Sequence, residues 1–394
     1  MSDALMATYA RLPVAFRRGE GAWLWDTEGR RYLDAVAGIA VCGLGHAHPA
    51  VTQAVCEQAG TLIHTSNLYG VPLQAELAER LCRQAGMDAA FFCNSGAEAN
   101  EAAIKLARLH GHRRGRGSPR IVVTDRAFHG RTLATLTATG NPRIQAGFDP
   151  LVEGFVRVPY DDLAALERVA GTEPEVAAVL LESIQGEAGV IVPDPNYLAG
   201  VRAVCDREGW LMMVDEVQTG MGRTGRWFGH QHAGCLPDVT TLAKSLGNGV
   251  PIGACLARGD AASLFGPGSH ATTFGGNPLA CRAALAVVET LEREDLITRA
   301  GDVGERMLAD LRARLAGRAG VSEIRGRGLM IGVALERPCQ VLAERALEHG
   351  LLINVTGERV VRLLPPLVIG DDEAEQIVET VAALVSGFLE GEIA

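Results

Sequence analysis

The sequence predicts an α/β protein with two parts, a large one built on a mostly parallel sheet and a smaller α+β one. Between residues 89 and 242, short apolar runs alternate with helical segments, which is typical of parallel strands covered by helices on both faces. After Pro278 the pattern changes to long helical stretches followed by closely spaced strands, which is typical of an α+β unit. The length of 394 residues allows more than one domain.

Six apolar runs account for the large sheet. The expected strands are Ala89–Cys93, Ile121–Thr124, Phe155–Val158, Val176–Leu181, Leu211–Val214 and Val239–Leu242. A helix from Ala97 to Leu109 follows the first strand, and the polar stretch His110–Pro119 is expected to be a surface loop. Because sites in parallel sheets form at the carboxyl ends of strands, the residues that follow these runs are the candidates for chemistry.

The C-terminal region supplies the elements of the smaller part. We expect helices Leu279–Glu292, Val303–Leu315 and Asp371–Leu389, and strands Leu329–Leu335, Leu351–Val355 and Val360–Leu363. The predicted division is an N-terminal segment at 1–48 that packs with the small domain, a large domain at 49–279, and a small domain at 280–394.

Composition excludes several classes of partner. A net charge of −10 argues against nucleic acid, and no apolar run is long enough to span a membrane. The N-terminus has no secretion signal, and the nine cysteines are scattered without a C-x-x-C pair. His46 and His48 lack partners at metal-ligand spacing. We therefore expect a reduced, cytoplasmic protein with no metal site.

Lysine is rare enough to be informative, because Lys105 and Lys244 are the only lysines among 37 basic residues. Arginine can replace lysine in most surface roles, but it cannot form a Schiff base. Lys105 follows Glu101 by four residues on a helix, so we expect an ordinary ion pair there. Lys244 comes just after a strand and has small neighbours, so it is the candidate for chemistry; taken alone, a structural ion pair is the competing interpretation.

Two further features occur at the ends of expected strands. Asp215 ends the run WLMMVD, and a carboxylate there suits the protonated ring nitrogen of pyridoxal phosphate (PLP), although a helix N-cap or a metal ligand also fits. Ser95 and Gly96 lie between a strand and a helix, where free N–H groups bind anions such as a phosphate. An ordinary capped helix is the alternative, and no nucleotide P-loop pattern is present.

The chain also resembles a known family in long blocks. These are GIAVCGLGHAHP, HTSNLYGVP, FFCNSGAEANEAAIKLAR, FHGRT, ESIQGEAGV, VDEVQTGMGRTG, LAKSLGNGVPIGA, TTFGGNP, RGRGLMIG and VVRLLPPL. They are similar to those of the class III (ornithine-type) aminotransferases, PLP-dependent transferases of fold type I. The chain departs from this family at Ser183, where proline is usual, and at Ala271, where glycine is common.

The resemblance implies a role for each cofactor-binding residue. Lys244 would bond covalently to PLP and then move the proton in catalysis, Asp215 would pair with the ring nitrogen, and Gln218 would bind the phenolic oxygen. Phe128 and Val217 would contact the two faces of the ring. The phosphate would be held by Ser95, Gly96 and Ala97, and by Thr273 of a neighbouring subunit, which implies a homodimer with shared active sites.

The resemblance also implies which residues bind substrate. Arg362 would bind the α-carboxylate of glutamate, Arg131 the distal carboxylate, and Glu187 would pair with Arg362 when the substrate presents an ω-amine. Thr272 and Tyr69 would lie near the substrate, although Tyr69 also fits a core position.

The implied reaction moves the δ-amine of N-acetylornithine to 2-oxoglutarate, a step of arginine biosynthesis. Succinylornithine, succinyl-diaminopimelate, ornithine and 4-aminobutyrate remain alternative donors. A racemase, aminomutase or decarboxylase needs no second, dicarboxylate substrate. The presence of Arg131, Arg362 and Glu187 therefore argues against these reactions. A binding protein without activity would not need Lys244, Asp215 and Gln218 together.

Overall fold

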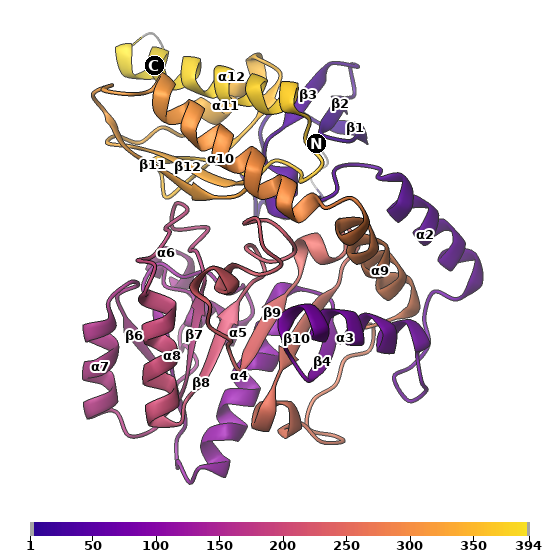
Figure 1. The fold of residues 1–394 in the computed structure, drawn as a ribbon, viewed down its shortest axis with the longest axis vertical. Helices are drawn as coiled ribbons and strands as arrows, with labels where there is room; N and C mark the ends of the chain where they lie inside the picture. Colours follow the sequence, from indigo (N-terminus) through magenta and orange to yellow (C-terminus); the bar gives the residue numbers. More distant parts are fainter. Residues whose placement is uncertain (1–3, 392–394) are drawn as a thin grey trace.

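The protein consists of two lobes, each built on its own sheet, as Figure 1 shows. The structure is a computed structural model that describes residues 4–391. The large lobe contains a seven-stranded sheet, and the small lobe contains a four-stranded sheet beneath helices near the C-terminus. This arrangement agrees with the predicted α/β class and its two parts.

The large sheet has the strand order β4-β10-β9-β8-β7-β5-β6. All neighbouring pairs from β9 to β6 are parallel, whereas β10 runs antiparallel to both of its neighbours. The sequence prediction missed β10, because GACLA is short and rich in small residues. The strands are β4 (Ala89–Cys93), β5 (Arg120–Thr124), β6 (Phe155–Val158), β7 (Val176–Glu182), β8 (Leu211–Asp215), β9 (Val239–Leu242) and β10 (Gly253–Ala257).

Helices cover both faces of this sheet, and strand β7 shows how the side chains divide. Ala178 and Leu180 belong to a core cluster that also includes residues of α4 (Gly96–Arg113), whereas Val179 and Leu181 pack with α7 (Leu163–Thr172) and α8 (Tyr197–Glu208). Alternate side chains of a strand point to opposite faces, so a sheet buried on both sides needs continuous apolar strands. The helix α4 is longer than predicted: His110 and Gly111 are buried in its last turn rather than in a surface loop.

The small lobe has the strand order β11-β12-β15-β14. Strand β11 was missed in the sequence because its side chains are mostly half-exposed and include three charged residues. The predicted strand Leu351–Val355 divides into two strands that join different sheets. The elements are α10 (Leu296–Arg314), β11 (Val321–Arg327), β12 (Met330–Leu335), α11 (Val341–Glu348), β13 (Leu351–Leu352), β14 (Asn354–Thr356), β15 (Val360–Leu363) and α12 (Asp371–Glu390).

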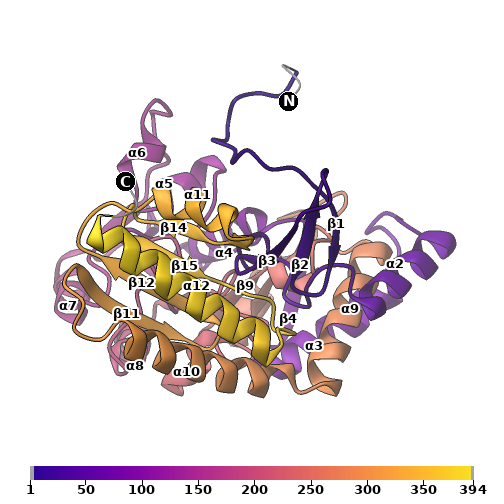
Figure 2. The same ribbon diagram turned by 90° about the horizontal axis from the view of Figure 1, so that it is seen from above.

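The N-terminal strands form a third sheet with the order β1-β2-β3-β13. Leu33 pairs with Leu351 in parallel, so residues more than three hundred positions apart lie side by side. Figure 2 shows these strands beside the helices of the small lobe. The division at residues 48 and 279 stays a prediction. The strands are β1 (Phe16–Glu20), β2 (Trp23–Asp26) and β3 (Arg31–Asp34).

Three helices of the large lobe, α2, α3 and α9, pack on one another beside the large sheet. Helices α2 and α3 pack against α9, on the right of Figure 1. No helix among residues 4–391 has the length and apolar character needed to cross a bilayer. The remaining helices are α1 (Ala37–Ala40), α2 (Pro49–Thr61), α3 (Pro72–Ala85), α5 (Leu133–Ala138), α6 (Pro142–Gln145), η1 (Gly229–Ala233), η2 (Lys244–Leu246), η3 (Gly259–Ser263) and α9 (Pro278–Arg293).

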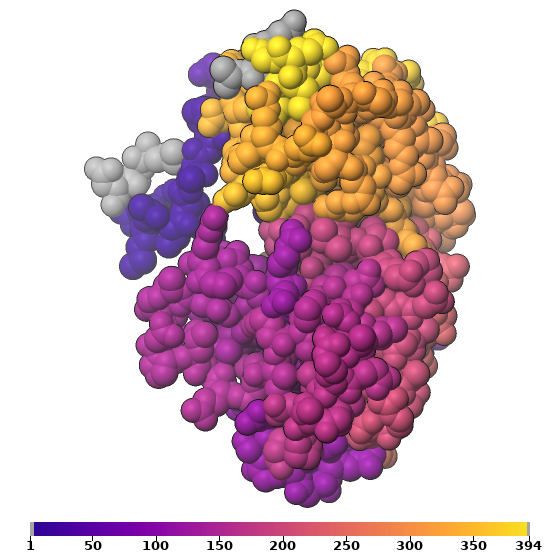
Figure 3. Space-filling model, turned by 90° about the vertical axis from the view of Figure 1, so that its left-hand side faces the viewer, coloured from indigo at the N-terminus to yellow at the C-terminus, as the bar shows by residue number. Residues whose placement is uncertain are grey.

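Very close backbone packing joins the lobes next to α10. Arg223, only 1 % exposed, donates from Nη1 to the carbonyl oxygens of Leu329 (3.0 Å) and Pro365 (2.5 Å). Across the lobes, a Cβ placed on Gly328 would lie 2.5 Å from the carbonyl carbon of Thr224. Within the small lobe, a Cβ placed on Gly304 would lie 2.1 Å from the carbonyl oxygen of Gly328. Only a glycine in α10 allows the turn at Gly328 to approach this closely. Figure 3 shows the small lobe, in orange and yellow, resting on the large lobe, in magenta.

We expect Gly304→Ala to destabilise the protein, because its methyl group would collide with backbone that cannot rotate away. A loss of about 2–4 kcal/mol in the free energy of unfolding is expected, measured by chemical denaturation. Gly301→Ala is the matched control, one turn earlier in the same helix, where the nearest atom to an added Cβ lies at an ordinary 3.5 Å. There the better helix propensity of alanine should raise stability by up to about 1 kcal/mol. Equal effects at the two positions would contradict this account of the packing.

Candidate active site

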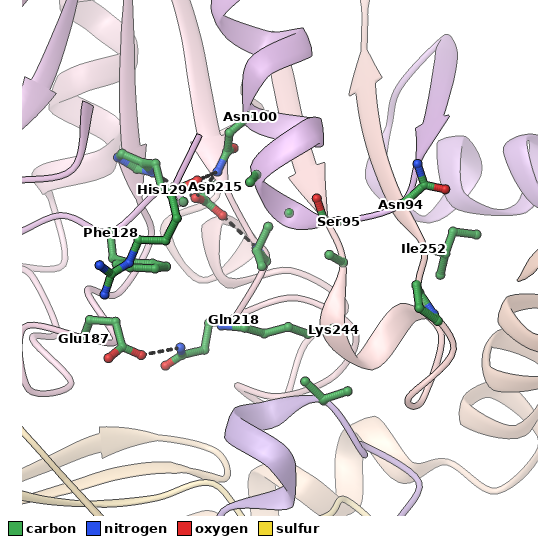
Figure 4. A pocket seen from close by; sticks show the side chains of 18 of the residues that line it. Asn94, Ser95, Asn100, Phe128, His129, Glu187, Asp215, Gln218, Lys244 and Ile252 are labelled. Carbon is green, nitrogen blue, oxygen red and sulfur yellow. Dashed lines mark hydrogen bonds and ion pairs between the residues drawn. The ribbon is translucent and has the colours of Figure 1, made fainter. Parts of the chain in front are cut away.

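The carboxyl ends of the large-sheet strands surround a cavity of about 390 Å³. Most of the candidate residues line it, and Figure 4 shows how their side chains point into one space. The strand-end rule therefore located the cavity correctly. The lining includes Ser95, Gly96, Ala97, Phe128, Arg131, Glu187, Asp215, Val217, Gln218 and Lys244.

Lys244 lies two residues beyond β9, at the first position of η2. Its backbone is left-handed, with φ 48°, which is strained for a residue with a side chain. Burial lowers the pKa of the amine, and the charge of Glu187 opposes this change. An amine with a lowered pKa is neutral more often at a given pH, and the neutral form is the nucleophile.

Asp215 is the last residue of β8 and is only 4 % exposed. Three groups hold its carboxylate: His129 Nδ1 (2.8 Å) and Asn100 Nδ2 (2.7 Å) donate to Oδ2, and the backbone N–H of Val217 (3.0 Å) donates to Oδ1. Asn100 in turn accepts from the hydroxyl of Thr241. The dashed lines of Figure 4 follow this network. A carboxylate supported in this way stays in place although it is buried.

The sequence prediction gave no role to His129 and did not consider Asn100. Both lie within hydrogen-bond distance of Asp215 in space but 86 and 115 residues from it in the chain. The FHGRT block and the middle of a helix carry no local signal that points to Asp215, so only the folded structure brings the three together.

The start of α4 forms one wall of the cavity. Ser95 is the N-cap, and its hydroxyl accepts from the backbone N–H of Glu98 at 3.2 Å. A Cβ on Gly96 would lie 2.8 Å from Val217 Cγ1, so glycine is needed for this close approach. Gly96 therefore lets the Val217 side chain pack directly against the start of this 18-residue helix, whose first N–H groups suit an anion.

A buried ion pair lies at the other end of the cavity. Arg362, on β15 of the small lobe, is 1 % exposed and donates from Nη1 to Glu187 Oε1 at 2.7 Å and to Gln218 Oε1 at 3.2 Å. Its Nε donates to Asn354 Oδ1 at 2.8 Å, whereas Nη2 is buried and has no partner among the described residues. Burial raises the pKa of Glu187, but the charge and hydrogen bond of Arg362 outweigh it, and the pKa is lowered.

Glu182 is a site residue that the sequence prediction missed. It ends β7, pairs in register with Asp215, and accepts from the backbone N–H groups of Phe128 (3.0 Å) and Gly186 (3.2 Å). Burial raises its pKa to about 7; His129 acts to lower the pKa, and Asp215 to raise it. Glu182 directly follows the apolar run Val176–Leu181, and this strand-end position is the signal that could have identified it.

Three candidates lie away from this arrangement. Thr272 and Thr273 line a second cavity of about 1000 Å³, together with residues 66–68. Tyr69 is exposed and lines neither cavity. Arg131 is exposed at the rim of the first cavity, with its guanidinium 5.7 Å from the centre of the Phe128 ring.

The expected ion pair between Lys105 and Glu101 was wrong. Lys105 Nζ instead donates to the carbonyl oxygen of Ser269 and to His270 Nδ1, each at 2.9 Å. Glu101 accepts from the hydroxyl of Thr132. The i,i+4 spacing allows an ion pair, but the Lys105 amine instead donates to acceptors on a segment that is distant in the chain.

Within residues 4–391, no group of three or more His, Cys, Asp or Glu side chains is arranged to hold a metal ion.

The two positions at which the chain departs from the family pattern lie in different surroundings. At Ser183, the buried hydroxyl donates to Thr219 Oγ1 at 2.9 Å. Ala271 is exposed.

Known proteins resemble this chain over its whole length. The profile of the family described as Aminotransferase class-III matches residues 5–385. The chain is 58 % identical over 389 residues to the acetylornithine aminotransferase of Nitrosomonas europaea, which covers 99 % of both chains. It is 35 % identical to an ornithine aminotransferase of Toxoplasma gondii that shows partial occupancy of PLP at its active site. The two structures match with a TM-score of 0.95, over 99 % of the present chain and 93 % of that protein. The chain is also 35 % identical to the acetylornithine aminotransferase of Elizabethkingia anophelis, with a TM-score of 0.88. This match covers 96 % of the present chain and 95 % of that protein. The expected fold type I is thereby confirmed.

We expect the ionisation of Glu182 to lower stability between about pH 4.5 and pH 7. The unfolded chain loses this proton near pH 4.5 and the folded protein near pH 7, so the folded state binds more protons in this window and stability falls as the pH rises. Glu182→Gln cannot ionise, so its stability relative to the natural protein should increase across the window, by up to about 3 kcal/mol. Chemical unfolding at a series of pH values measures this difference. A difference that does not change with pH would refute the raised pKa.

Proposed function

The chain belongs to the class-III aminotransferases, and on that premise we propose that it transfers the δ-amine of N-acetylornithine to 2-oxoglutarate. The products are N-acetylglutamate 5-semialdehyde and glutamate. The chain is an aminotransferase, and its cofactor is pyridoxal 5'-phosphate, the group present in a related ornithine aminotransferase. The observation that carries the proposal is the Glu187–Arg362 pair in the same cavity as Lys244.

The residues of the cavity fit this cofactor. A buried carboxylate, Asp215, faces the space where a ring nitrogen needs a counter-charge. Ser95, Gly96 and Ala97 line the cavity at the start of α4, where the N–H groups of a helix N-terminus suit a phosphate. The buried amine of Lys244, with its lowered pKa, matches the nucleophile that a cofactor aldehyde requires.

In the mechanism, bound PLP supplies an electron sink for the carbon that loses a proton. Lys244 Nζ would hold the cofactor and then move one proton away from the substrate carbon that bears the amine. Asp215 would keep the ring nitrogen protonated, Gln218 would bind the phenolic oxygen, and Phe128 and Val217 would fix the tilt of the ring. The phosphate would be bound by Ser95, Gly96 and Ala97.

The pair of Glu187 and Arg362 would let one pocket serve two substrates. While the pair is closed, Arg362 is neutralised and a donor can present an ω-amine without an α-carboxylate. When 2-oxoglutarate enters, its α-carboxylate would displace Glu187 and bind Arg362 through two N–H groups. The unpartnered Nη2 of Arg362 is a second donor available for this purpose. Arg131, at the rim, would bind the distal carboxylate.

The active enzyme that we propose is a homodimer in the cytoplasm. Thr272 and Thr273 lie in the second cavity, so they would act at the site of a neighbouring subunit, Thr273 on the phosphate and Thr272 near substrate. Exposed apolar side chains around this cavity would be covered by the partner, and Tyr69 would approach the partner's substrate. These side chains are Leu62, Ile63, Leu68, Tyr69 and Phe274. The nine cysteines are all free thiols, which suits a reducing compartment.

A panel of amino donors tests the substrate. With 2-oxoglutarate as acceptor, N-acetylornithine should have a kcat/KM at least about tenfold above those of ornithine and 4-aminobutyrate. Succinylornithine and succinyl-diaminopimelate complete the panel, and Lys244→Ala gives the background rate, which we expect about 10²–10⁴-fold lower. A higher kcat/KM for any other donor would reject N-acetylornithine as the substrate.

Glu187→Gln should separate the two half-reactions. With no carboxylate to neutralise Arg362, the half-reaction with the ω-amino donor should slow by about tenfold, whereas the half-reaction with 2-oxoglutarate should be unchanged or faster. Single-turnover spectroscopy of each half-reaction measures the rates separately. Glu358→Gln, which breaks an exposed pair with Arg143, is the control and should leave both rates unchanged. Equal losses in the two half-reactions would argue against an exchange at Arg362.

A further inference from the structure

Lys105 has no part in the mechanism above, yet it is the only other lysine in the chain. It lies in α4 and is half-buried. Its amine donates to two successive residues of a distant segment, the carbonyl oxygen of Ser269 and the ring nitrogen Nδ1 of His270, both at 2.9 Å. Within residues 4–391 it forms no ion pair with a carboxylate.

The segment that Lys105 holds is residues 266–273, which lie between η3 and α9 and form neither helix nor strand. At the end of this segment, Asn67 Nδ2 donates to the carbonyl oxygen of Thr272 (3.3 Å) and Asn94 Nδ2 donates to its hydroxyl (3.4 Å). Nearer the start, the contacts other than those of Lys105 are a local turn and aromatic packing. The backbone N–H of Ser269 donates to the carbonyl oxygen of Gly266 in a turn, and the His270 ring packs at 4.7 Å from Phe91 and 5.3 Å from Phe265. Thr273 follows three residues after His270 and is exposed. The two bonds from Lys105 therefore tie a segment without regular structure to the longest helix of the large lobe.

The chemistry at this contact favours lysine. A compact ammonium group can donate to two acceptors that lie side by side, whereas a guanidinium is larger and planar. His270 Nδ1 must be unprotonated to accept this bond, and burial together with the charge of Lys105 lowers the pKa of His270. A chain that uses arginine at nearly every other basic position retains lysine at this contact.

We infer that Lys105 is a positioning residue that holds Ser269 and His270 so that Thr273 reaches the cofactor phosphate of a second copy of this chain. This inference rests on the dimer of the proposed function. It gives α4 two tasks: its first turn binds the phosphate of its own subunit, and Lys105, about 13 Å further along the helix, orders the segment that serves the neighbouring subunit.

A double-mutant cycle on cofactor affinity tests the inference. PLP is titrated into the cofactor-free full chain, and binding is followed by the visible absorbance of the bound cofactor. Lys105→Met and Thr273→Val should each raise the dissociation constant of PLP about tenfold. If Lys105 acts through Thr273, the double variant should bind PLP no more weakly than Thr273→Val alone. Losses that multiply in the double variant would overturn the inference.

Two further variants guard against a general loss of structure. Arg113→Met removes another cation of α4, one that donates to the carbonyl oxygens of Ser263 and Leu264 just before the segment, and it should leave PLP affinity unchanged. His270→Phe keeps the aromatic packing but removes the acceptor, and it should reproduce the loss seen in Lys105→Met. Unchanged affinity in His270→Phe would overturn the inference even if Lys105→Met does not fold.

Hybrid dimers show which subunit's site is affected. A subunit carrying both Lys244→Ala and Lys105→Met is paired with a natural subunit, so that the only functional Lys244 faces the altered segment. PLP affinity at that site should be reduced about tenfold. In the alternative pairing, Lys244→Ala on one subunit and Lys105→Met on the other, affinity should be normal. The opposite pattern would overturn the inference.

Sedimentation velocity separates the two proposals. A natural chain that binds PLP as a monomer would reject the dimer and, with it, the action of Lys105 on a neighbouring site. A dimer in which Lys105→Met binds PLP as tightly as the natural chain would reject only the role of Lys105.

Discussion

The structure depends on one buried negative charge, the carboxylate of Asp215 at the end of a central strand. Burying this charge at the edge of an apolar sheet raises the free energy of the folded state unless hydrogen-bond donors surround it. His129, Asn100 and the backbone of residue 217 provide three donors, and Thr241 fixes the orientation of Asn100. These groups come from a loop, a turn, a helix and a strand, so distant parts of the large lobe have to assemble before the charge is stabilised.

A second acid lies beside the first and is treated differently. Glu182 and Asp215 are in register on neighbouring strands, but Glu182 receives two backbone N–H groups and its pKa is raised to about 7. Two full negative charges so close together in an apolar environment would repel each other. Asp215 accepts from His129, Asn100 and the backbone of residue 217, and Glu182 holds the segments that carry Phe128 and Gly186. Both acids therefore hold neighbouring segments in place around the cavity.

The carboxylate-binding end of the site is built from both lobes. Arg362 and Asn354 come from the sheet of the small lobe, whereas Glu187 and Gln218 follow strands of the large lobe. Any shift of one lobe against the other would change the distance between Arg362 and Glu187. The contacts of Arg223 and the close approach of Gly328 to Thr224 hold the two lobes together next to α10, at a distance from the cavity.

The sequence by itself determined the α/β class, and it predicted the strand ends that carry chemistry and a shared site for Lys244, Asp215, Arg362 and Glu187. These predictions follow from local apolar patterns and from blocks of sequence similar to a known family, both of which can be read from neighbouring residues. The tertiary structure alone decided the rest: the antiparallel strand β10, the division of residues 351–355 between two sheets, the partners of Asp215, and the acceptors of Lys105. The physical reason is the same in each case. A hydrogen bond between segments that are separate in the chain depends on which surfaces are buried together, and no pattern of neighbouring residues predicts that choice.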